Sequence, residues 1–324
     1  MKISHCLRWA VAACGALPAY HAAAQTAFPA KSIRIVVPFP PGAFNDTLGR
    51  TIAQKFTEGG FGQALVDNRP GAGSTLGADL VAKSPGDGHT LLIVAFPFAV
   101  NATLYTRLPY NTEKDFLPVI HAGATPNLLV AHPSVPAKSV RELIALAKAN
   151  PGQLNYASTG SGSSNHISME LFKMMTATRI THIPYKGSAP AVTDMMGGHV
   201  MMMFDNTPNV LPHVKAGKIR GLAVTSLKRS ALAPEIPTVD ESGVPGYEIN
   251  VWFGVVGPAG MPREVVTRLN AEINRILQIP DVRERFQNGG VEPIGGTPER
   301  FGEHLRAEIV KWGKVVRESG AKVE

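Results

Sequence analysis

Short runs rich in valine, isoleucine and leucine recur along this chain, separated by stretches with helical spacing, and this alternation constrains the fold more than any other feature. Strands that alternate with helices are typical of α/β proteins with largely parallel sheets. The clearest predicted strands are Ile33–Phe39, Leu91–Phe96, Leu128–His132, Leu154–Ser158, Val200–Asp205, Gly221–Thr225 and Val251–Gly257.

Apolar residues near the C-terminus recur every four positions, which is the spacing of an amphipathic helix. They form two series, Val265, Leu269, Ile273 and Leu277, and then Phe301, Leu305 and Ile309. With 324 residues, 44% hydrophobic and 18% charged, the chain is expected to be globular, with one large or two medium domains.

No low-complexity linker divides the chain, so two domains would have to be joined by ordered strands. The extended stretches Gly123–Ser134 and Ser242–Gly254 are candidates for these crossings. The chain would then leave one domain, build another and return. This gives a discontinuous domain 1 of residues 27–126 plus 246–324, and a domain 2 of residues 127–245.

The first 24 residues are typical of a signal peptide, with Lys2 and Arg8 in front of a short apolar run and a small-residue step before a cleavage after Ala24. The run is too short to be a permanent membrane helix, which needs about 20 apolar residues. Lipoprotein anchoring at Cys14 is the less favoured alternative. Cleavage would also remove Cys6 and leave no disulfide, thiolate nucleophile or cysteine-ligated metal.

The formal net charge of +7 falls to +5 once Lys2 and Arg8 leave with the signal peptide. The remaining basic residues are scattered, without the lysine and arginine stripe or interleaved aromatic residues of a nucleic-acid groove. A mildly basic exported protein therefore favours small anionic ligands over DNA.

Four segments repeat one local design, in which a strand is followed by a loop of small residues or proline and then by a helix start. They are "VVPFPPGAFND", "IVAFPFAVN", "NYASTGSGSSNH" and "HIPYKGSAPAV". In open α/β sheets, ligands lie beyond the carboxyl ends of the strands, where such loops gather. Free N–H groups and the positive end of the helix dipole attract anions there.

In the first of these loops, Pro40 and Pro41 stiffen the turn and Gly42 permits close approach to the backbone. The amides of residues 43–45 could then point at a carboxylate. The alternative is a rigid turn with no ligand.

The loop "TGSGSSNH" offers the hydroxyls of Thr159, Ser161, Ser163 and Ser164 at the start of a helix. It lacks the Gly-Lys-Ser/Thr ending of a phosphate-binding P-loop and the G-x-S-x-G of a nucleophile elbow. A hydroxyl-lined anion cradle fits better, and a simple capped helix start is the alternative. His166 could be a catalytic base, although a helix histidine is more often packed or hydrogen-bonded.

The roles of two acids near these loops stay open. Asp46 could stabilise the first turn of its helix. Asp205 could receive a ligand ammonium or hydroxyl, and either acid would repel a ligand carboxylate unless water or protonation intervened.

Two further patterns favour structural roles. The glycines of "NRPGAGSTLGA" have the wrong final spacing for a dinucleotide site and predict a turn into a helix. The methionine clusters 174–175, 195–196 and 201–203 favour core packing over a metal site.

Several motifs, taken together and in order, resemble the Bug family of extracytoplasmic solute-binding receptors of tripartite tricarboxylate transporters. The resemblance runs from about Phe28 to the C-terminus. It is carried by "IVVPFPPGAFND", "VDNRPGAGSTLGADLVAKSPGDGHTLL", "LPYNTEKDFLPV", "LNYASTGSGSSNH", "IPYKGSAPAVTDMMGGHVMMMFDN" and "WFGVVGPAGMP".

The resemblance implies a type II periplasmic binding protein fold, in which two α/β domains close over a ligand cleft at the hinge. It also implies a monomer in the periplasm that binds a small carboxylate, works with integral membrane transporter subunits, and has no cofactor, metal, nucleic-acid partner or enzyme activity. The ligand-binding residues carried over are Phe39, Pro40, Pro41, Gly42, Ala43, Phe44, Asn45, Asp46, Phe96, Thr159, Gly160, Ser161, Gly162, Ser163, His166, Tyr185, Lys186, Gly187 and Asp205.

One departure from the family pattern concerns the ligand. The family usually has Pro-Pro-Gly-Gly in the first loop, whereas this chain has Ala43 followed by Phe44. With Phe96 and Phe98, Phe44 could make the pocket less polar, which predicts an aromatic or otherwise bulky carboxylate in preference to citrate.

Two other functions stay open at this point. A sensory module would dock its ligand-bound form on a membrane receptor kinase without transport. An exported serine hydrolase would pair Ser161, Ser163 or Ser164 with His166 and an orienting acid.

Overall fold

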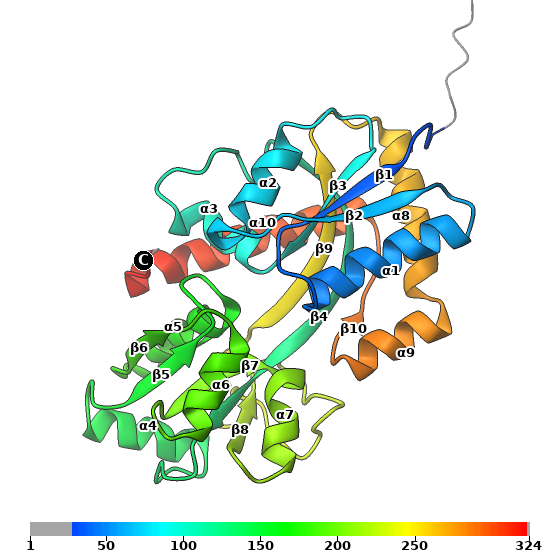
Figure 1. Ribbon diagram of the computed structural model, residues 1–324. Helices are drawn as coiled ribbons and strands as arrows, with labels where there is room; N and C mark the ends of the chain where they lie inside the picture. The colour runs from blue at the N-terminus through cyan, green and yellow to red at the C-terminus, as the bar shows by residue number, and fades with distance from the viewer. Residues whose placement is uncertain (1–27, 323–324) are drawn as a thin grey trace, which may run out of the picture.

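The computed structural model describes residues 28–322, and within them ten strands form one hydrogen-bonded sheet that extends through two lobes, with two of the strands paired to a third beside the main strand order (Figure 1). The predicted signal peptide, with Cys6 and Cys14, lies outside the described residues. Within residues 28–322, no helix is both long and apolar enough to cross a membrane.

The first lobe contains the parallel strands β1 (Ile33–Val37), β2 (Ala64–Asn68) and β3 (Thr90–Ala95), with β9 (Asn250–Pro258) antiparallel to β3. The short strand β10 (Glu292–Pro293) pairs with β4 (Phe116–Ala131). The helices of this lobe are α1 (Phe44–Glu58), η1 (Ala72–Ser74), α2 (Thr75–Ala82), α3 (Pro97–Leu104), α8 (Arg263–Leu277), α9 (Pro280–Asn288) and α10 (Pro298–Ser319).

The second lobe is built on the parallel strands β5 (Asn155–Ser158), β6 (Thr181–Pro184) and β7 (Met202–Asn206). β8 (Arg220–Val224) pairs with β4. The helices are α4 (Val140–Ala149), α5 (Ser164–Thr176), α6 (Ser188–Met196) and α7 (Thr207–Lys215).

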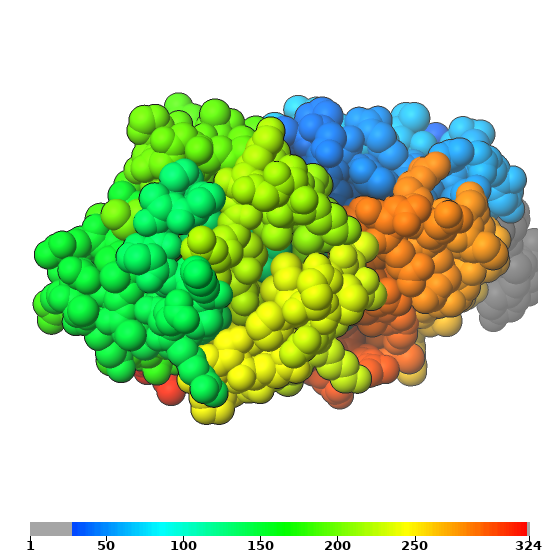
Figure 2. Space-filling model, turned by 90° about the horizontal axis from the view of Figure 1, so that it is seen from below, coloured from blue at the N-terminus to red at the C-terminus, as the bar shows by residue number. Residues whose placement is uncertain are grey.

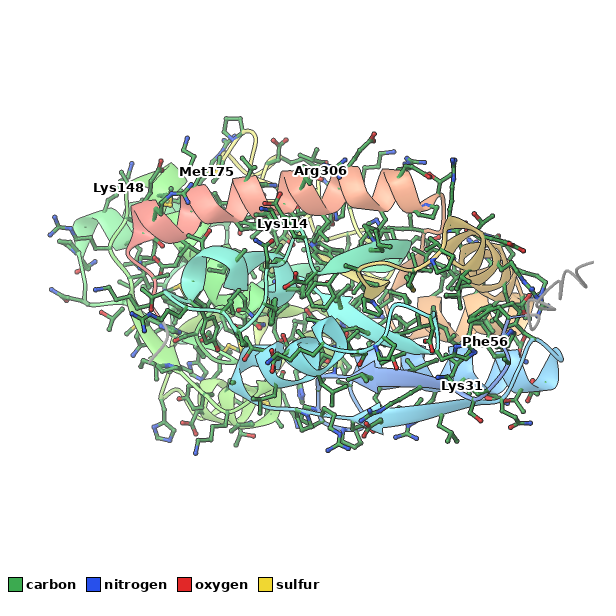
Figure 3. The ribbon with its side chains drawn as sticks, turned by 90° about the horizontal axis from the view of Figure 1, so that it is seen from above. Lys31, Phe56, Lys114, Lys148, Met175 and Arg306 are labelled. Carbon is green, nitrogen blue, oxygen red and sulfur yellow. The ribbon has the colours of Figure 1, made fainter. Side chains whose placement is uncertain are left out.

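Strand β4 joins the two lobes. Its residues 116–126 pair with β9, and its residues 127–131 pair with β7 and β8. Because β4 forms hydrogen bonds with strands of both lobes, the connection between the lobes is an ordered strand, as predicted for the stretch Gly123–Ser134. The lobes also meet through α10, whose C-terminal part packs against α5 (Figure 3), and through Gly290, which lies against Pro208. In Figure 2 the orange segment of the first lobe adjoins the yellow segment of the second.

Each lobe has its own apolar core. In the first, strands β1, β3 and β9 are covered by side chains from α1, α8 and α10. In the second, alternate residues of β4 enter two separate cores, with Leu129 on one face of the sheet and Leu128 and Val130 on the other. Met195 and Met203 are fully buried in the latter core, which confirms the packing interpretation for these methionines.

All seven predicted strands are present, and the two predicted C-terminal helices are α8 and α10. The expectation of largely parallel sheets holds within each lobe, whereas β4 and β9 are antiparallel to each other and to their neighbours. The sequence reading missed β2, β6, β10 and the first part of β4. β2 and β6 are the two edge strands, and edge strands bury too little surface to show a continuous apolar pattern.

Candidate functional site

Four helix starts follow the carboxyl ends of β1, β5, β6 and β7, and they carry most of the predicted ligand-binding residues. The β1 loop leads into α1 of the first lobe, and the other three lead into α5, α6 and α7 of the second. In Figure 1 the loop before α1 is on the side of the first lobe that faces α6. Both lobes can therefore contribute backbone N–H groups to the space between them.

The first-lobe loop is held in shape by the buried carboxylate of Asp46. Its Oδ2 accepts hydrogen bonds from the Gly42 backbone N–H (3.1 Å) and from Arg50 Nε (2.9 Å), and its Oδ1 accepts one from Asn68 Nδ2 (2.9 Å). Asn68 Nδ2 also donates to the Phe39 carbonyl oxygen (3.2 Å), so both ends of the loop are tied to one carboxylate–amide pair.

Hydrogen bonds from neighbouring groups stabilise the negative charge of the Asp46 carboxylate. Burial alone would raise the pKa of this carboxyl, but the hydrogen bonds from Arg50, Asn68 and Gly42 outweigh it and hold the pKa below its usual value. Asp46 therefore acts within the protein as a clamp on the loop, and its oxygens already have donors.

Gly42 and the first turn of α1 leave backbone groups open. Gly42 has φ = +94°, a conformation that side chains rarely adopt, and a Cβ added to it would meet nothing within 4 Å. Ala43, the N-cap of α1, provides no side-chain cap. Among residues 28–322, the N–H groups of Phe44 and Asn45 have no hydrogen-bond partner. An anion could be bound by these groups with help from the helix dipole.

The β5 loop is a capped helix start whose hydroxyl protons are mostly committed to the protein. Ser163 Oγ donates to the Gly160 carbonyl oxygen (2.7 Å) and accepts from the His166 backbone N–H (3.3 Å). Thr159 Oγ1 donates to Asn165 Oδ1 (2.6 Å). Internal acceptors take the protons of Thr159 and Ser163, so these two hydroxyls are not free donors for an anion in this arrangement.

His166 is a packed residue in this site. Its Nδ1 accepts the Gly162 N–H (3.1 Å), its ring stacks on His182 at 4.2 Å, and burial lowers its pKa. Within residues 28–322, neither ring nitrogen hydrogen-bonds a serine hydroxyl. The neighbouring contact between Ser158 Oγ and His182 Nε2 (2.6 Å) involves a serine that is completely buried. No nucleophile–base pair is therefore assembled in this loop.

The β6 loop resembles the first-lobe loop in its backbone. Gly187, the N-cap of α6, has φ = +114°, open space on its Cβ side and no side-chain cap. Tyr185 turns its hydroxyl away to Asp194 Oδ2 (2.8 Å). Lys186 is exposed and forms no ion pair within the described part of the chain. This loop therefore combines an uncapped helix start with a free cation.

Asp205, at the end of β7, joins the three helix starts of the second lobe. Its Oδ1 accepts from Asn165 Nδ2 (3.0 Å), the Asn206 N–H (2.7 Å) and Asn209 Nδ2 (3.2 Å), and its Oδ2 accepts from the Ser188 hydroxyl. Burial raises the pKa of this carboxyl, and its four hydrogen bonds act in the opposite direction. Asp205 therefore positions α5, α6 and α7, and its oxygens are occupied within the protein.

The aromatic side chains expected near the ligand are mostly in the first-lobe core. Phe96 is fully buried with its ring 5.0 Å from that of Trp312, and Phe98 is 2% exposed. The expectation that Phe96 and Phe98 line the pocket is therefore not met, because both belong to a helix start that is packed under α10. Phe44 is half-buried, with its ring against Phe253 and Phe286.

Sequence reasoning missed three polar residues that hold the loops in place, Arg50 and Asn68 in the first loop and Asn209 beside Asp205. Asn165 and Ser188, which also bind Asp205, lie within the stretches Thr159–His166 and Tyr185–Ala189 that the family resemblance implied. Asn68 ends β2, a strand that the sequence did not reveal.

Two hollows in the described part of the chain are lined by residues other than Gly42 and Gly187. One, of about 280 Å³, is lined by Ser161, His166, Glu170, Lys173, His182 and residues 319–322. Its only overlap with the predicted site is at Ser161 and His166, on the side where α5 meets the end of α10.

Comparison with known proteins identifies the family. The sequence model described as "Tripartite tricarboxylate transporter family receptor" (TctC) matches residues 49–321. The chain belongs to this family. Its Bug relatives include BugT from Bordetella pertussis, which is 40% identical over 299 residues covering 92% of each chain. A protein from the tcbD-tcbE intergenic region of Pseudomonas sp. strain P51 is 42% identical over 90% of this chain and 87% of its own length.

Solved structures of TctC-type proteins have the same fold. The structure described as R. palustris Rpa4515 with adipate has a TM-score of 0.82 and 40% identity, and covers 92% of this chain and 100% of its own. MatC from Rhodopseudomonas palustris with bound malate has a TM-score of 0.78 and 31% identity over 89% of this chain and all of its own. The expected α/β periplasmic binding protein fold is therefore confirmed.

Proposed function

We propose that this TctC-family protein is a periplasmic receptor that captures a small carboxylate between its lobes and delivers it to integral membrane transporter subunits. Membership of the family supports the receptor role, and the relatives solved with adipate and malate support a carboxylate ligand. The predicted signal peptide supports export to the periplasm, with lipoprotein anchoring at Cys14 as the less favoured route.

The observation that carries the proposal is a pair of matching helix starts, one in each lobe. Helices α4, α5 and α10 have serine or threonine side-chain caps at Ser139, Ser163 and Thr297. The other α-helices within residues 28–322 begin without a side-chain cap, and among them α1 and α6 each start beside a glycine of positive φ, Gly42 or Gly187, with nothing within 4 Å of its Cβ position. A carboxylate can supply the missing acceptors, and Lys186 adds a positive charge.

The proposed mechanism is closure of two domains, residues 27–126 plus 246–324 and residues 127–245. The change of pairing partners along β4 supports a division at this position. A ligand that contacts both α1 and α6 only in the closed arrangement shifts the population toward closure. The proposal requires neither a cofactor nor a metal, and it treats the receptor as a monomer.

The two other functions lead to different observations. A serine hydrolase is disfavoured because His166 Nδ1 accepts the Gly162 N–H and Ser163 donates to the Gly160 carbonyl oxygen, so a fluorophosphonate probe should leave the protein unlabelled. A sensory module would use the same closed surface, so growth of a deletion strain on the ligand separates signalling from uptake.

The testing experiment is thermal unfolding of the mature protein, refolded from denaturant to remove captured ligand, with mono-, di- and tricarboxylates and aromatic acids. A ligand at 100 times its dissociation constant stabilises the folded state by about 2.7 kcal/mol, which raises the midpoint measurably. A raised midpoint with at least one acid supports the proposal, and no shift with any acid contradicts it. Aromatic acids also test the bulky-ligand preference, which now depends on Phe44 alone.

A further inference from the structure

The second lobe contains a chain of hydrogen bonds whose direction is fixed by two groups that can only accept. Asn165 Nδ2 donates to the Phe204 carbonyl oxygen (2.8 Å) and to Asp205 Oδ1 (3.0 Å). These two bonds use both amide protons and turn Asn165 Oδ1 toward Thr159. The 2.6 Å bond between Thr159 Oγ1 and Asn165 Oδ1 must therefore use the threonine proton.

Ser188 is oriented in the same way by the other oxygen of the same carboxylate. Its hydroxyl donates to Asp205 Oδ2, and its oxygen is approached by Asn209 Nδ2 at 3.4 Å. Thr159 and Ser188 are both half-buried, so they keep part of their surface outside the core. Because each hydroxyl already donates its single proton within the protein, its oxygen can only accept a hydrogen bond from a further partner.

A third acceptor adjoins these two. Asn206 Oδ1 is buried and has no hydrogen-bond partner among the described residues, while the Asn206 backbone N–H binds Asp205. A buried carbonyl oxygen without a hydrogen-bond donor lowers the stability of the folded state. A donor from outside the protein would remove this penalty at Asn206 Oδ1. The acceptors Thr159, Ser188 and Asn206 therefore all belong to the network around Asp205.

We propose that the second lobe presents hydrogen-bond acceptors to its ligand through Thr159 and Ser188, so that the preferred ligand is a carboxylate that also carries a hydroxyl or amino group. This inference depends on the proposed receptor function and makes it more specific. The ligand carboxylate is bound by the open N–H groups at α1 and α6, and the donor group pairs with the oxygens held by Asp205 and Asn165.

The solved relatives leave this choice open. Adipate, found with Rpa4515, has no hydroxyl group, whereas malate, found with MatC, has one. A matched set of four-carbon dicarboxylates separates the possibilities: succinate has no donor, L-malate has a hydroxyl and L-aspartate has an ammonium group.

The test is isothermal titration of the refolded full-length mature protein with these three acids. We expect L-malate or L-aspartate to bind at least tenfold more tightly than succinate, and the better of the two identifies the donor. Equal affinity for all three would overturn the inference and leave the receptor function standing. Failure of every acid in the wider panel would instead contradict the receptor function itself.

Variants locate the effect. Ser188→Ala should weaken binding of the preferred acid about tenfold and leave succinate within twofold of wild type, and Thr159→Val should act in the same direction. Thr159→Ser, which keeps the hydroxyl, should restore the preference. Ser242→Ala is the matched control, because Ser242 also donates its proton internally, to the Thr238 carbonyl oxygen (2.6 Å), outside this network. Equal weakening of all three acids by Ser188→Ala would show a purely structural role and overturn the inference.

Discussion

Two buried aspartates, Asp46 in the first lobe and Asp205 in the second, organise the two halves of the proposed site in different ways. Asp46 is bonded to a backbone N–H, an amide and the guanidinium of Arg50. Asp205 is bonded to four donors, all of them neutral. Both carboxylates fix loops, but only one has a cation to balance its charge.

This difference sets the direction in which each pKa moves. Burial acts first on both carboxyls and raises their pKa values. The contacts with Arg50, Asn68 and Gly42 outweigh burial at Asp46 and lower its pKa, whereas neutral donors are not enough at Asp205 and its pKa stays raised. The same residue type can therefore support a loop as a stabilised anion in one lobe and as a costly buried charge in the other.

The strongest prediction concerns stability. Asp205→Ala removes the acceptor of four donors, of which Asn165 is buried and Ser188 and the Asn206 N–H are partly buried. Each unsatisfied buried donor costs about 1–3 kcal/mol, so we expect a loss of about 3 kcal/mol. Asp46→Ala should cost about 1–2 kcal/mol, because water can reach Gly42 and Arg50. Urea unfolding at pH 7 measures both. Equal losses, or the reverse order, would show that the two aspartates do not differ in the way described.

The next effect concerns ligand binding by the first-lobe loop. Gly42→Val should reduce ligand affinity at least tenfold, because a branched side chain at positive φ distorts the loop and blocks approach to its N–H groups. Gly260→Val is the control, since Gly260 is also exposed, has φ = +84° and has nothing within 4 Å of its Cβ position. The two variants should lose similar stability, and only the first should lose binding. Unchanged affinity in Gly42→Val would remove this loop from the site.

The smallest effect is the pH dependence, and its sign differs between the two aspartates. Asp46 has a lowered folded pKa, so its stabilising contribution is present above the unfolded value of about 3.8 and is lost as the pH falls through the folded pKa. Asp205 has a raised folded pKa, so between about 3.8 and that pKa the folded state binds the extra proton and stability falls as the pH rises.

Asp46→Asn and Asp205→Asn, each compared with wild type by urea unfolding between pH 7 and pH 2.5, measure this difference. The advantage of wild type over Asp46→Asn should shrink toward low pH, and that of wild type over Asp205→Asn should grow. Each slope is at most about 1.4 kcal/mol per pH unit, and less for Asp46 because Arg50 is more than half exposed. If the two stability differences changed with pH in the same direction, the pKa values of Asp46 and Asp205 would not be shifted in opposite directions.

The amino-acid sequence was enough to predict the main strands, the two C-terminal helices, the crossing through β4 and the loops that bear the candidate site. These features are local, because strand and helix periods and Gly/Pro turns are encoded over four to fifteen residues. The edge strands β2 and β6 escaped because they bury little surface. The domain boundaries and the ligand-binding roles stay predictions.

The hydrogen-bond partners of the polar side chains became known only from the folded structure. The sequence placed hydroxyls at Thr159 and Ser163 but could not show that Asn165 and Gly160 accept their protons. It placed Asp205 after a strand without showing that Ser188 and Asn209 bind it. Such pairings join residues up to 40 positions apart, and the direction of a hydrogen bond depends on which partner can only accept. That information exists only when the strands and helices are packed together.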